Sequence, residues 1–336
     1  MNSKDKLRGS TIGSAAAMLF ALAALTMSAV RPAGAQDLTT VRFGDQTGSE
    51  VDYAAVWVAD LNGYYKDEGI QLERKTYANG PAALLDLNNL DAVTAAIVPY
   101  MLFAARGGDV TMVMSTTKGN APIVGKKQYI SVNQLAGKNV GTPGIGTIHD
   151  AVLGYIEETQ GFKVNHVPAK ISDVAVMIEK GDVEAFIGWE PASAAAIAQA
   201  PNLLHYIQQL PPIANAESLE LAFRPAYIKD HPETVVKFIR ATLKGIDWIK
   251  ANGPEKTAEL LSKKMNDPSS YAINLEALQS VDLTKPLIDM PSVRVWLTAI
   301  AKQGKIPEDL VKDVDGWVGK YVDYSYLNKA QASLNN

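Results

Sequence analysis

The segment VRFGDQTGSEVDYAAVWVADLNGYYKDEGIQLERKT, residues 41–76, alternates short apolar runs with a longer amphipathic stretch. Within it, the stretches 41–44 and 70–76 are predicted strands. Between them, 51–67 predicts a helix, because Ala54, Ala55, Val58, Leu61 and Tyr65 fall on one helical face. Strand, helix and strand in this order are typical of a parallel sheet with helices on its faces.

The same alternation continues along the chain. Further strands are predicted at 92–98 and 110–115, and Pro81 is a first-turn proline that opens another helix. A second block, 117–218, contains predicted strands at 139–142, 164–168, 184–188 and 203–206, with helices at 147–160, 171–180 and 190–199. A strand at 219–224 and a helix at 233–252 follow.

We therefore expect an α/β protein of two lobes, with 36–116 and 219–336 forming the first and 117–218 the second. In such sheets a ligand lies beyond the carboxyl ends of the strands, so a cleft between the lobes is the expected site.

The N-terminus has the features of a secretion signal. Lys4, Lys6 and Arg8 precede an uncharged run at 9–30, and Ala33-Gly34-Ala35 follows it. This pattern predicts a signal peptide over 1–35, cleaved after Ala35, and a mature protein in the bacterial periplasm. An uncleaved membrane anchor is the alternative, since the run is long enough to span a bilayer.

Composition excludes several classes of function. The chain has no cysteine, which removes thiolate catalysis and thiolate metal sites. Its four histidines, at 149, 166, 205 and 231, are irregularly spaced, so we expect no metal and no cofactor. A net charge of −4 disfavours nucleic acid as a partner. Hydrolase and phosphate-loop motifs are absent from the sequence, so we do not expect an enzyme.

Two strand-to-helix junctions are candidate ligand contacts. The first, 142–147, holds Thr142, Gly144, Gly146 and Thr147, and its backbone N–H groups can seat an anion at a helix N-terminus. The alternative is an ordinary turn capped by Thr147; a dinucleotide loop would need a third glycine where His149 stands.

The second junction contains Trp189 and Glu190. Trp189 offers a flat apolar wall and one N–H donor, although core packing would also explain it. Glu190 either faces the cleft or is simply stabilised by the dipole of the helix that follows.

Several short stretches resemble a known family. They are YYKDEGI at 64–70, Gly80-Pro81, NQLAGK at 133–138, GDVEA at 181–185 with Trp189-Glu190-Pro191, and His231-Pro232-Glu233. Together they are similar to the substrate-binding proteins of ABC importers in the nitrate, sulfonate and taurine group, also described as SsuA/THI5-like. The resemblance covers most of the chain to about residue 265.

The resemblance implies a type II periplasmic binding protein, with ligand held between two lobes that close over it. It implies a monomer that captures a small anionic or zwitterionic organic molecule, such as a sulfonate, taurine or a carboxylate, and delivers it to an inner-membrane permease. A periplasmic sensor for a membrane receptor is the alternative, and a fold-related enzyme is a weaker one.

The resemblance also suggests ligand contacts after the first and third strands. These are Gln46 and Thr47, and Pro99 and Tyr100, with Phe223 on the cleft floor. The chain crosses between the lobes twice, and we expect Ser115, Thr116, Thr117, Leu221 and Ala222 to act as the hinge, because a few backbone angles there can absorb closure.

Overall fold

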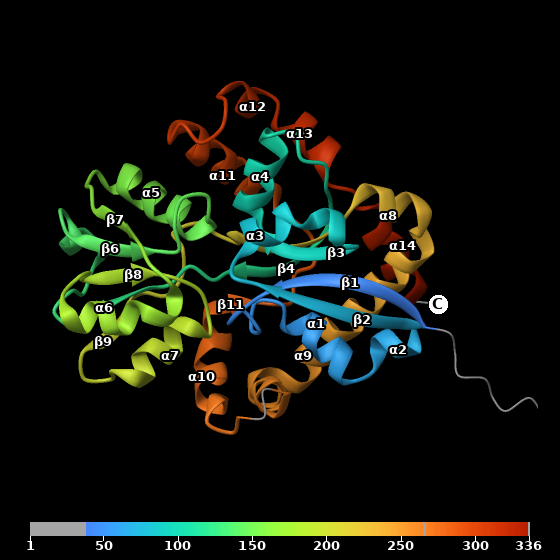
Figure 1. Ribbon diagram of the computed structural model, residues 1–336, viewed down its shortest axis with the longest axis horizontal. Coiled ribbons are helices and arrows are strands. Elements are labelled where there is room, and N and C mark those ends of the chain that lie inside the picture. The colour runs from blue at the N-terminus through green and yellow to red at the C-terminus, as the bar shows by residue number, and fades with distance from the viewer. Residues whose placement is uncertain (1–37, 265–266, 335–336) are drawn as a thin grey trace, which may run out of the picture. The chain divides into compact units, whose positions relative to one another are not determined.

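The computed structural model describes residues 38–264 and 267–334 and contains two sheets flanked by helices (Figure 1). The predicted signal peptide and its cleavage after Ala35 lie outside these residues. Within the described part of the chain, no helix is both long and apolar enough to cross a bilayer.

The first sheet has the strand order β11-β4-β10-β3-β1-β2. Its strands are β1 (Thr39–Gln46), β2 (Ile70–Tyr77), β3 (Ala92–Ala96), β4 (Thr111–Gly119), β10 (Glu217–Phe223) and β11 (Val281–Asp282). β1 is parallel to β2 and β3, whereas β10 is antiparallel to β3 and β4. The second sheet has the order β7-β6-β8-β5-β9. Its strands are β5 (Ile123–Lys126), β6 (Asn139–Thr142), β7 (Asn165–Pro168), β8 (Ala185–Ile187) and β9 (Leu204–Gln208).

Both sheets are mainly parallel, as expected, because β1, β2, β3 and β4 run in one direction in the first sheet and β6, β7, β8 and β9 do so in the second. β5 is the strand that opposes its neighbours in the second sheet, and β10 opposes β3 and β4 in the first. Both β5 and β10 directly follow a crossing of the chain between the sheets. Gly119 at the end of β4 donates its N–H to the carbonyl of Ala216 at 2.8 Å, so the chain leaves and rejoins the first sheet at neighbouring points.

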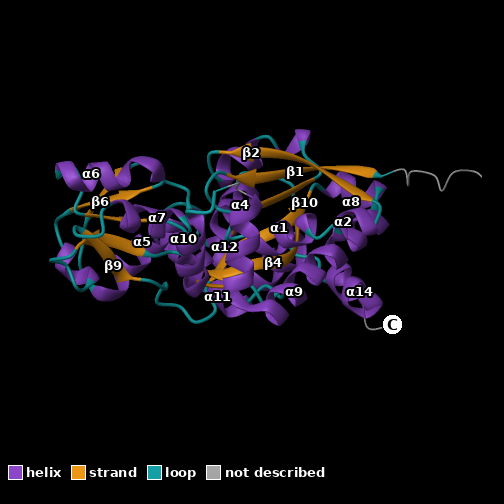
Figure 2. Cartoon of the chain, turned by 90° about the horizontal axis from the view of Figure 1, so that it is seen from below, coloured by secondary structure: helices purple, strands orange, loops and turns teal. Residues whose placement is uncertain are grey.

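Helices cover the sheets, and Figure 2 shows strands gathered in two groups with helices around each. They are α1 (Ala54–Leu61), α2 (Tyr64–Asp67), α3 (Gly80–Leu85), α4 (Ile97–Ala105), α5 (Ile148–Gln160), α6 (Val174–Lys180), α7 (Ala192–Gln199), α8 (Pro225–Asp230), α9 (Pro232–Lys264), α10 (Ser270–Ala277), α11 (Met290–Lys302), α12 (Asp309–Lys312), α13 (Val314–Tyr321) and α14 (Ser325–Leu334).

The second sheet shows how alternation along a strand builds two packed layers. Ala185 and Ile187 of β8 belong to the apolar cluster that includes α5, whereas Phe186 between them belongs to the cluster around α6 and α7. Successive side chains of a strand point to opposite faces, so this short strand is covered on both sides. α5 itself begins where the Thr147 side chain accepts from the N–H of Asp150, and ends at Gly161, whose φ of 73° suits glycine.

The boundaries of several elements differ from the predictions. The predicted strand 92–98 ends at Ala96, because α4 already begins at Ile97. The predicted helix 51–67 divides into α1 and α2 at Gly63, whose φ is 78°. β5 and β11 were not predicted, and the helix predicted over 233–252 continues to Lys264 across a non-helical Gly253.

Candidate binding site

A cavity of about 40 Å³, within about 380 Å³ of space that is partly open to solvent, is lined by residues that follow strands of both sheets. From the side of the first sheet come Gln46, Ser49, Asp52, Asn79, Gly80, Pro81, Ala96, Pro99 and Leu219, and from the side of the second come Thr147, Ile148, His149 and Trp189. Most of these positions lie at or beyond the carboxyl ends of β1, β2, β3, β6 and β8. The cavity therefore occupies the place where open α/β sheets hold ligands.

Four residues singled out in the sequence line this cavity, namely Gln46, Pro99, Thr147 and Trp189. Gln46 is buried, with its side-chain amide donating to the carbonyl of Thr94. Thr147 is the N-cap of α5, and its hydroxyl donates to the carbonyl of Gly144 at 2.8 Å. The indole N–H of Trp189 donates to the carbonyl of Gly48 at 2.9 Å, which joins a loop of the second sheet to a loop of the first.

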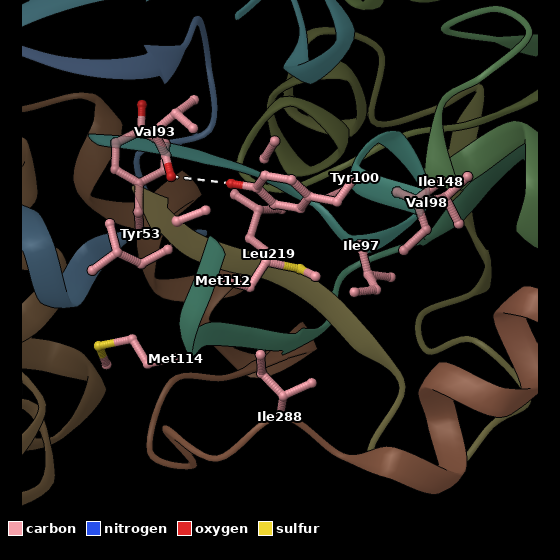
Figure 3. Packing of buried hydrophobic residues seen from close by; sticks show 14 of the residues in the cluster. Tyr53, Val93, Ile97, Val98, Tyr100, Met112, Met114, Ile148, Leu219 and Ile288 are labelled. Carbon is pink, nitrogen blue, oxygen red and sulfur yellow. Dashed lines mark hydrogen bonds between the residues drawn. The ribbon is translucent and has the colours of Figure 1, made fainter. Parts of the chain in front are cut away.

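The remaining predicted contacts are not among the lining residues, which are confined to those named above. They are Thr47, Tyr100, Thr142, Gly144, Gly146, Glu190 and Phe223. Tyr100 is wholly buried, and its hydroxyl hydrogen is shared between the carbonyls of Val93 and Glu220, each at 3.1 Å. Figure 3 shows the bond to Val93. Phe223 packs edge-on against Phe238, with 5.4 Å between ring centroids.

The polar groups of the glycine turn before α5 form hydrogen bonds with one another. The N–H of Gly144 donates to the hydroxyl of Thr142 at 3.1 Å, and the N–H of Thr147 donates to the carbonyl of Gly144 at 3.3 Å. Gly144 and Gly146 have φ of 107° and 91°, conformations that favour glycine. The turn thus shapes the start of α5 and has fewer free N–H groups for an anion than the sequence suggested.

The predicted hinge residues lie on the central, paired strands β4 and β10. Ser115, Thr116 and Thr117 are on β4, and Leu221 and Ala222 are on β10. The hydroxyl of Thr116 donates to the carbonyl of Leu219 at 3.1 Å. All five residues are buried. Their role in closure stays a prediction.

Two titratable residues of the lining were not predicted from the sequence, Asp52 and His149. Asp52 lies in the loop between β1 and α1, and nothing in its local pattern marks it. His149 is in the first turn of α5, two residues after the N-cap Thr147. This position next to a predicted ligand contact is the feature of the sequence that could have identified it. The other lining residues that were not predicted as ligand contacts are Ser49, Asn79, Gly80, Pro81, Ala96, Ile148 and Leu219.

His149 is neutral. Burial lowers its pKa to about 4, although a hydrogen bond to the backbone of Asn120 acts in the opposite direction. Its ring lies 5.2 Å from that of Trp189, centroid to centroid. Its Nε2 atom is buried and has no hydrogen-bond partner among the described residues. His149 can therefore offer a buried nitrogen to a ligand that reaches it.

Asp52 is also buried, and burial raises the pKa of its carboxyl well above the usual range, while the hydrogen bond from the Asn120 side chain only partly opposes this. The neighbouring Glu190 raises it further. The direction of this shift favours the carboxylic acid form of Asp52, which can donate a hydrogen bond as well as accept one.

Glu190 is held beside the cavity by its own partners. One of its carboxyl oxygens accepts from the hydroxyl of Tyr206 at 2.7 Å and the other from the N–H of Ala194 at 3.0 Å. Burial raises its pKa to about 7. Its side chain thus stabilises the start of α7. This agrees with the alternative given for Glu190 in the sequence analysis, in which the residue is stabilised at the start of the following helix.

The lining has no basic side chain and is partly aromatic. Among its described residues none is Lys or Arg; burial raises the pKa of Asp52 and lowers that of His149, so both shifts favour the uncharged forms. Within the described part of the chain, no cluster of three or more His, Asp or Glu residues is arranged to hold a metal ion.

Comparison with known proteins places this geometry in context. A family model described as NMT1/THI5 like matches residues 50–256. The formylaminopyrimidine-binding protein of Halalkalibacterium halodurans is 24% identical over 238 residues, which are 66% of this chain and 71% of that protein.

Solved structures are similar over most of the chain. The periplasmic nitrate-binding protein NrtA from Synechocystis PCC 6803 has a TM-score of 0.73 at 15% identity and covers 89% of each chain. The alkanesulfonate-binding protein SsuA from Xanthomonas axonopodis pv. citri, bound to MOPS, has a TM-score of 0.68 at 13% identity, covering 80% of this chain and 94% of that one. The two-lobed α/β fold of periplasmic binding proteins, expected from the sequence, is confirmed.

Proposed function

Because the chain belongs to the NMT1/THI5-like family, we propose that it is the periplasmic solute-binding component of an ABC importer. It captures one small molecule between its two sheets and presents it to an inner-membrane permease. The names of its relatives support this, since they describe binding proteins for a formylaminopyrimidine, nitrate and an alkanesulfonate. The signal peptide predicted over 1–35 supports export.

The ligand we propose is a small neutral nitrogen heterocycle with an N–H donor, of the aminopyrimidine class. One observation carries this choice: Asp52, His149 and Trp189 line a single cavity whose described lining has no Lys or Arg. A planar ring stacks on Trp189, and its ring nitrogen and amino group reach Asp52 and His149.

This proposal differs from the anion or zwitterion expected from the sequence, which stays a prediction. A sulfonate or carboxylate would be desolvated in this cavity, and burying an unpaired charge is costly. The N-terminus of α5 contributes about 0.3–1 kcal/mol per charge, up to ~2 kcal/mol when partly buried. Micromolar binding needs about 8 kcal/mol, so a cation would have to supply the rest.

A thermal-shift screen tests the ligand class. The probes are 4-aminopyrimidine, taurine, ethanesulfonate and benzoate, each at the same concentration and at pH 7. We expect 4-aminopyrimidine to raise the melting temperature most, because a ligand at 100 times its Kd stabilises the folded state by about 2.7 kcal/mol. A larger shift with taurine, ethanesulfonate or benzoate would show that the ligand is an anion or zwitterion.

Trp189→Ala tests the site with the same assay. The substitution removes the stacking wall and the N–H that joins Trp189 to Gly48, so we expect the shift with 4-aminopyrimidine to disappear. Trp317→Phe is the matched control, since Trp317 is buried in α13 and is not part of the lining. An unchanged shift in Trp189→Ala would remove this residue from the site.

A further inference from the structure

The segment 287–305, which contains α11, is attached at one end to the two places where the chain crosses between the sheets. Lys118 lies on β4 just before the first crossing, and Glu217 begins β10 just after the second. The Nζ atom of Lys118 donates to the carbonyl of Leu287 at 2.9 Å, and the N–H of Asp289 donates to the carboxyl of Glu217. Lys118 and Glu217 also form a buried ion pair with each other. This end of the segment is therefore fixed to the first sheet beside the predicted hinge.

The other end of the segment is attached to α5, which packs on the second sheet. The Nζ atom of Lys305 lies 2.6 Å from Oδ2 of Asp150, and both side chains are largely buried. The side-chain amide of Gln303 donates to the carbonyl of Ala151 at 3.2 Å. Asp150 and Ala151 directly follow His149, which lines the cavity, so this end of the segment holds the part of α5 that borders the site.

Trp296 joins the two sides in the middle of α11. Its side chain is fully buried, and its indole N–H donates to the carbonyl of Glu217 at 3.1 Å. Its ring packs edge-to-face with that of Tyr155 in α5, with 6.0 Å between the ring centroids. α11 also contacts α4, on the side of the first sheet, as well as α5 (Figure 1). The segment is thus bound to one side at its start, to the other at its end, and to both between them.

Opening of the cleft separates these attachment points. In the closed arrangement the indole of Trp189 donates to the carbonyl of Gly48 across the cavity. When the second sheet rotates away about the predicted hinge, α5 moves with it, whereas residues 287–289 stay with the first sheet. The contacts of Lys305 and Gln303 with α5 are then lost. Contacts that exist only in the closed state stabilise that state relative to the open one.

We propose that the segment 287–305 is a strap that raises the population of the closed arrangement before any ligand binds. The Lys305–Asp150 pair is its main attachment to α5, because this pair is more enclosed than the Lys302–Glu158 pair, which joins the same elements at 2.6 Å. An exposed pair contributes less than a buried one to any equilibrium. This inference goes beyond the proposed function, since the strap changes affinity through the population of the closed state and not through a contact with the ligand.

Lys305→Met tests the strap without ligand. The substitution keeps the length of the side chain but removes its charge, and Asp150 retains its contact with His166 at 2.7 Å. Spin labels on Leu85→Cys and Ile145→Cys, on the sides of the first and second sheet, report the separation of the sheets. In the ligand-free protein at pH 7 we expect Lys305→Met to shift the distribution of label distances to longer values. The ratio of long to short distances should rise about threefold or more.

Lys244→Met is the matched control. Lys244 is also a partly buried lysine, with its Nζ atom 2.8 Å from Oε1 of Glu68, and Glu68 likewise retains a second partner, Arg240. All three residues lie on the side of the first sheet, so we expect this variant to leave the distance distribution unchanged. A melting curve of each variant establishes that it is folded at the temperature of the measurement.

A charge reversal on the exposed pair gives a second test that leaves the core intact. Lys302→Glu places a like charge opposite Glu158, and the repulsion between strap and α5 should lengthen the label distances. The double variant Lys302→Glu with Glu158→Lys restores the attraction, so we expect its distribution to return to that of the wild type. A general loss of stability would not be reversed by the second substitution.

The outcomes separate the strap from the proposed function. An unchanged distribution in Lys305→Met, or an equal lengthening in Lys244→Met, overturns the strap and leaves the binding function standing. If Lys305→Met does not fold, the charge reversal decides: no lengthening in Lys302→Glu, or a lengthening that the double variant does not reverse, overturns the strap. Failure of every ligand in the thermal-shift screen would disprove the proposed ligand class without affecting these distances, which are measured with no ligand.

Discussion

Glu190 shows how burial changes the charge of a side chain that the sequence would count as an anion. Its carboxyl is enclosed, paired with Tyr206 and Ala194, and has its pKa raised to about 7. The folded protein therefore holds this proton at pH values where the unfolded chain has released it. Folding stability consequently decreases as the pH rises from the unfolded value near 4.5 through about 7.

Glu190→Gln should remove this part of the pH dependence. Gln is a permanent mimic of the protonated acid and can donate to Tyr206 while accepting from Ala194. Between pH 5 and pH 8 we expect the wild type to lose about 2–3 kcal/mol more unfolding free energy than the variant. Urea denaturation at both pH values measures the difference. Parallel losses in the two proteins would mean that Glu190 is ionised in the native state throughout.

The side chains of the site differed in how well they could be predicted. Trp189, Pro99 and Thr147 are found next to strand ends and helix starts, which are local signals. Asp52 is in a loop, and what gives it a role is burial beside Asn120, a contact between residues 68 positions apart. No local pattern contains that information. The same holds for Tyr100, which follows a strand as expected but points into the core.

Helices α1 and α9 approach each other so closely that one glycine is required between them. A Cβ atom on Gly245 of α9 would lie 2.2 Å from the carbonyl oxygen of Ala55 in α1. Backbone atoms on both helices would have to shift, and α1 directly follows the loop that carries Ser49 and Asp52. The close packing of α1 against α9 therefore supports the loop that forms part of the cavity wall.

Gly245→Ala should destabilise the protein by roughly 1–3 kcal/mol, the usual cost of overpacking. Gly319→Ala is the matched control, because Gly319 is exposed on α13 and a Cβ there meets nothing within 4 Å. That control should be stabilising by about 0.5–1 kcal/mol, since alanine favours a helix over glycine. Urea unfolding measures both, and a neutral or stabilising Gly245→Ala would contradict the close approach.

Among the secondary-structure elements, those with a clear period were predicted best. β6 was predicted at its observed bounds, and α5 within one residue, because the cap at Thr147 and Gly161 mark its ends. β5 was missed because its four residues are too short for a period and its pairing with β8 and β9 is set by tertiary contacts. The end of β3 was predicted wrongly because the run 92–98 is apolar except for Thr94 and does not show where the strand becomes a helix.

Closure of the two sheets over a ligand can be measured because the chain has no cysteine. Leu85 on α3 and Ile145 before α5 are 83% and 84% exposed, so cysteines placed there accept spin labels without disturbing packing. We expect 4-aminopyrimidine to shift the distribution of distances between the two spin labels to shorter values and to narrow it, because the ligand binds the closed state better. The pair Gln71 and Leu85, both on the side of the first sheet, should not change. A bound ligand with no shift in the first pair would argue against closure.

The point where the chain leaves and rejoins the first sheet has a consequence for ancestry. Because Gly119 and Ala216 are hydrogen-bonded neighbours, the segment between them begins and ends at almost the same place. We expect such a segment to be exchangeable between homologues as a cassette, yielding chimaeras that still fold. The exchanged segment would include His149 and Trp189, which form part of the cavity lining. A single recombination event could therefore change the ligand specificity of the protein.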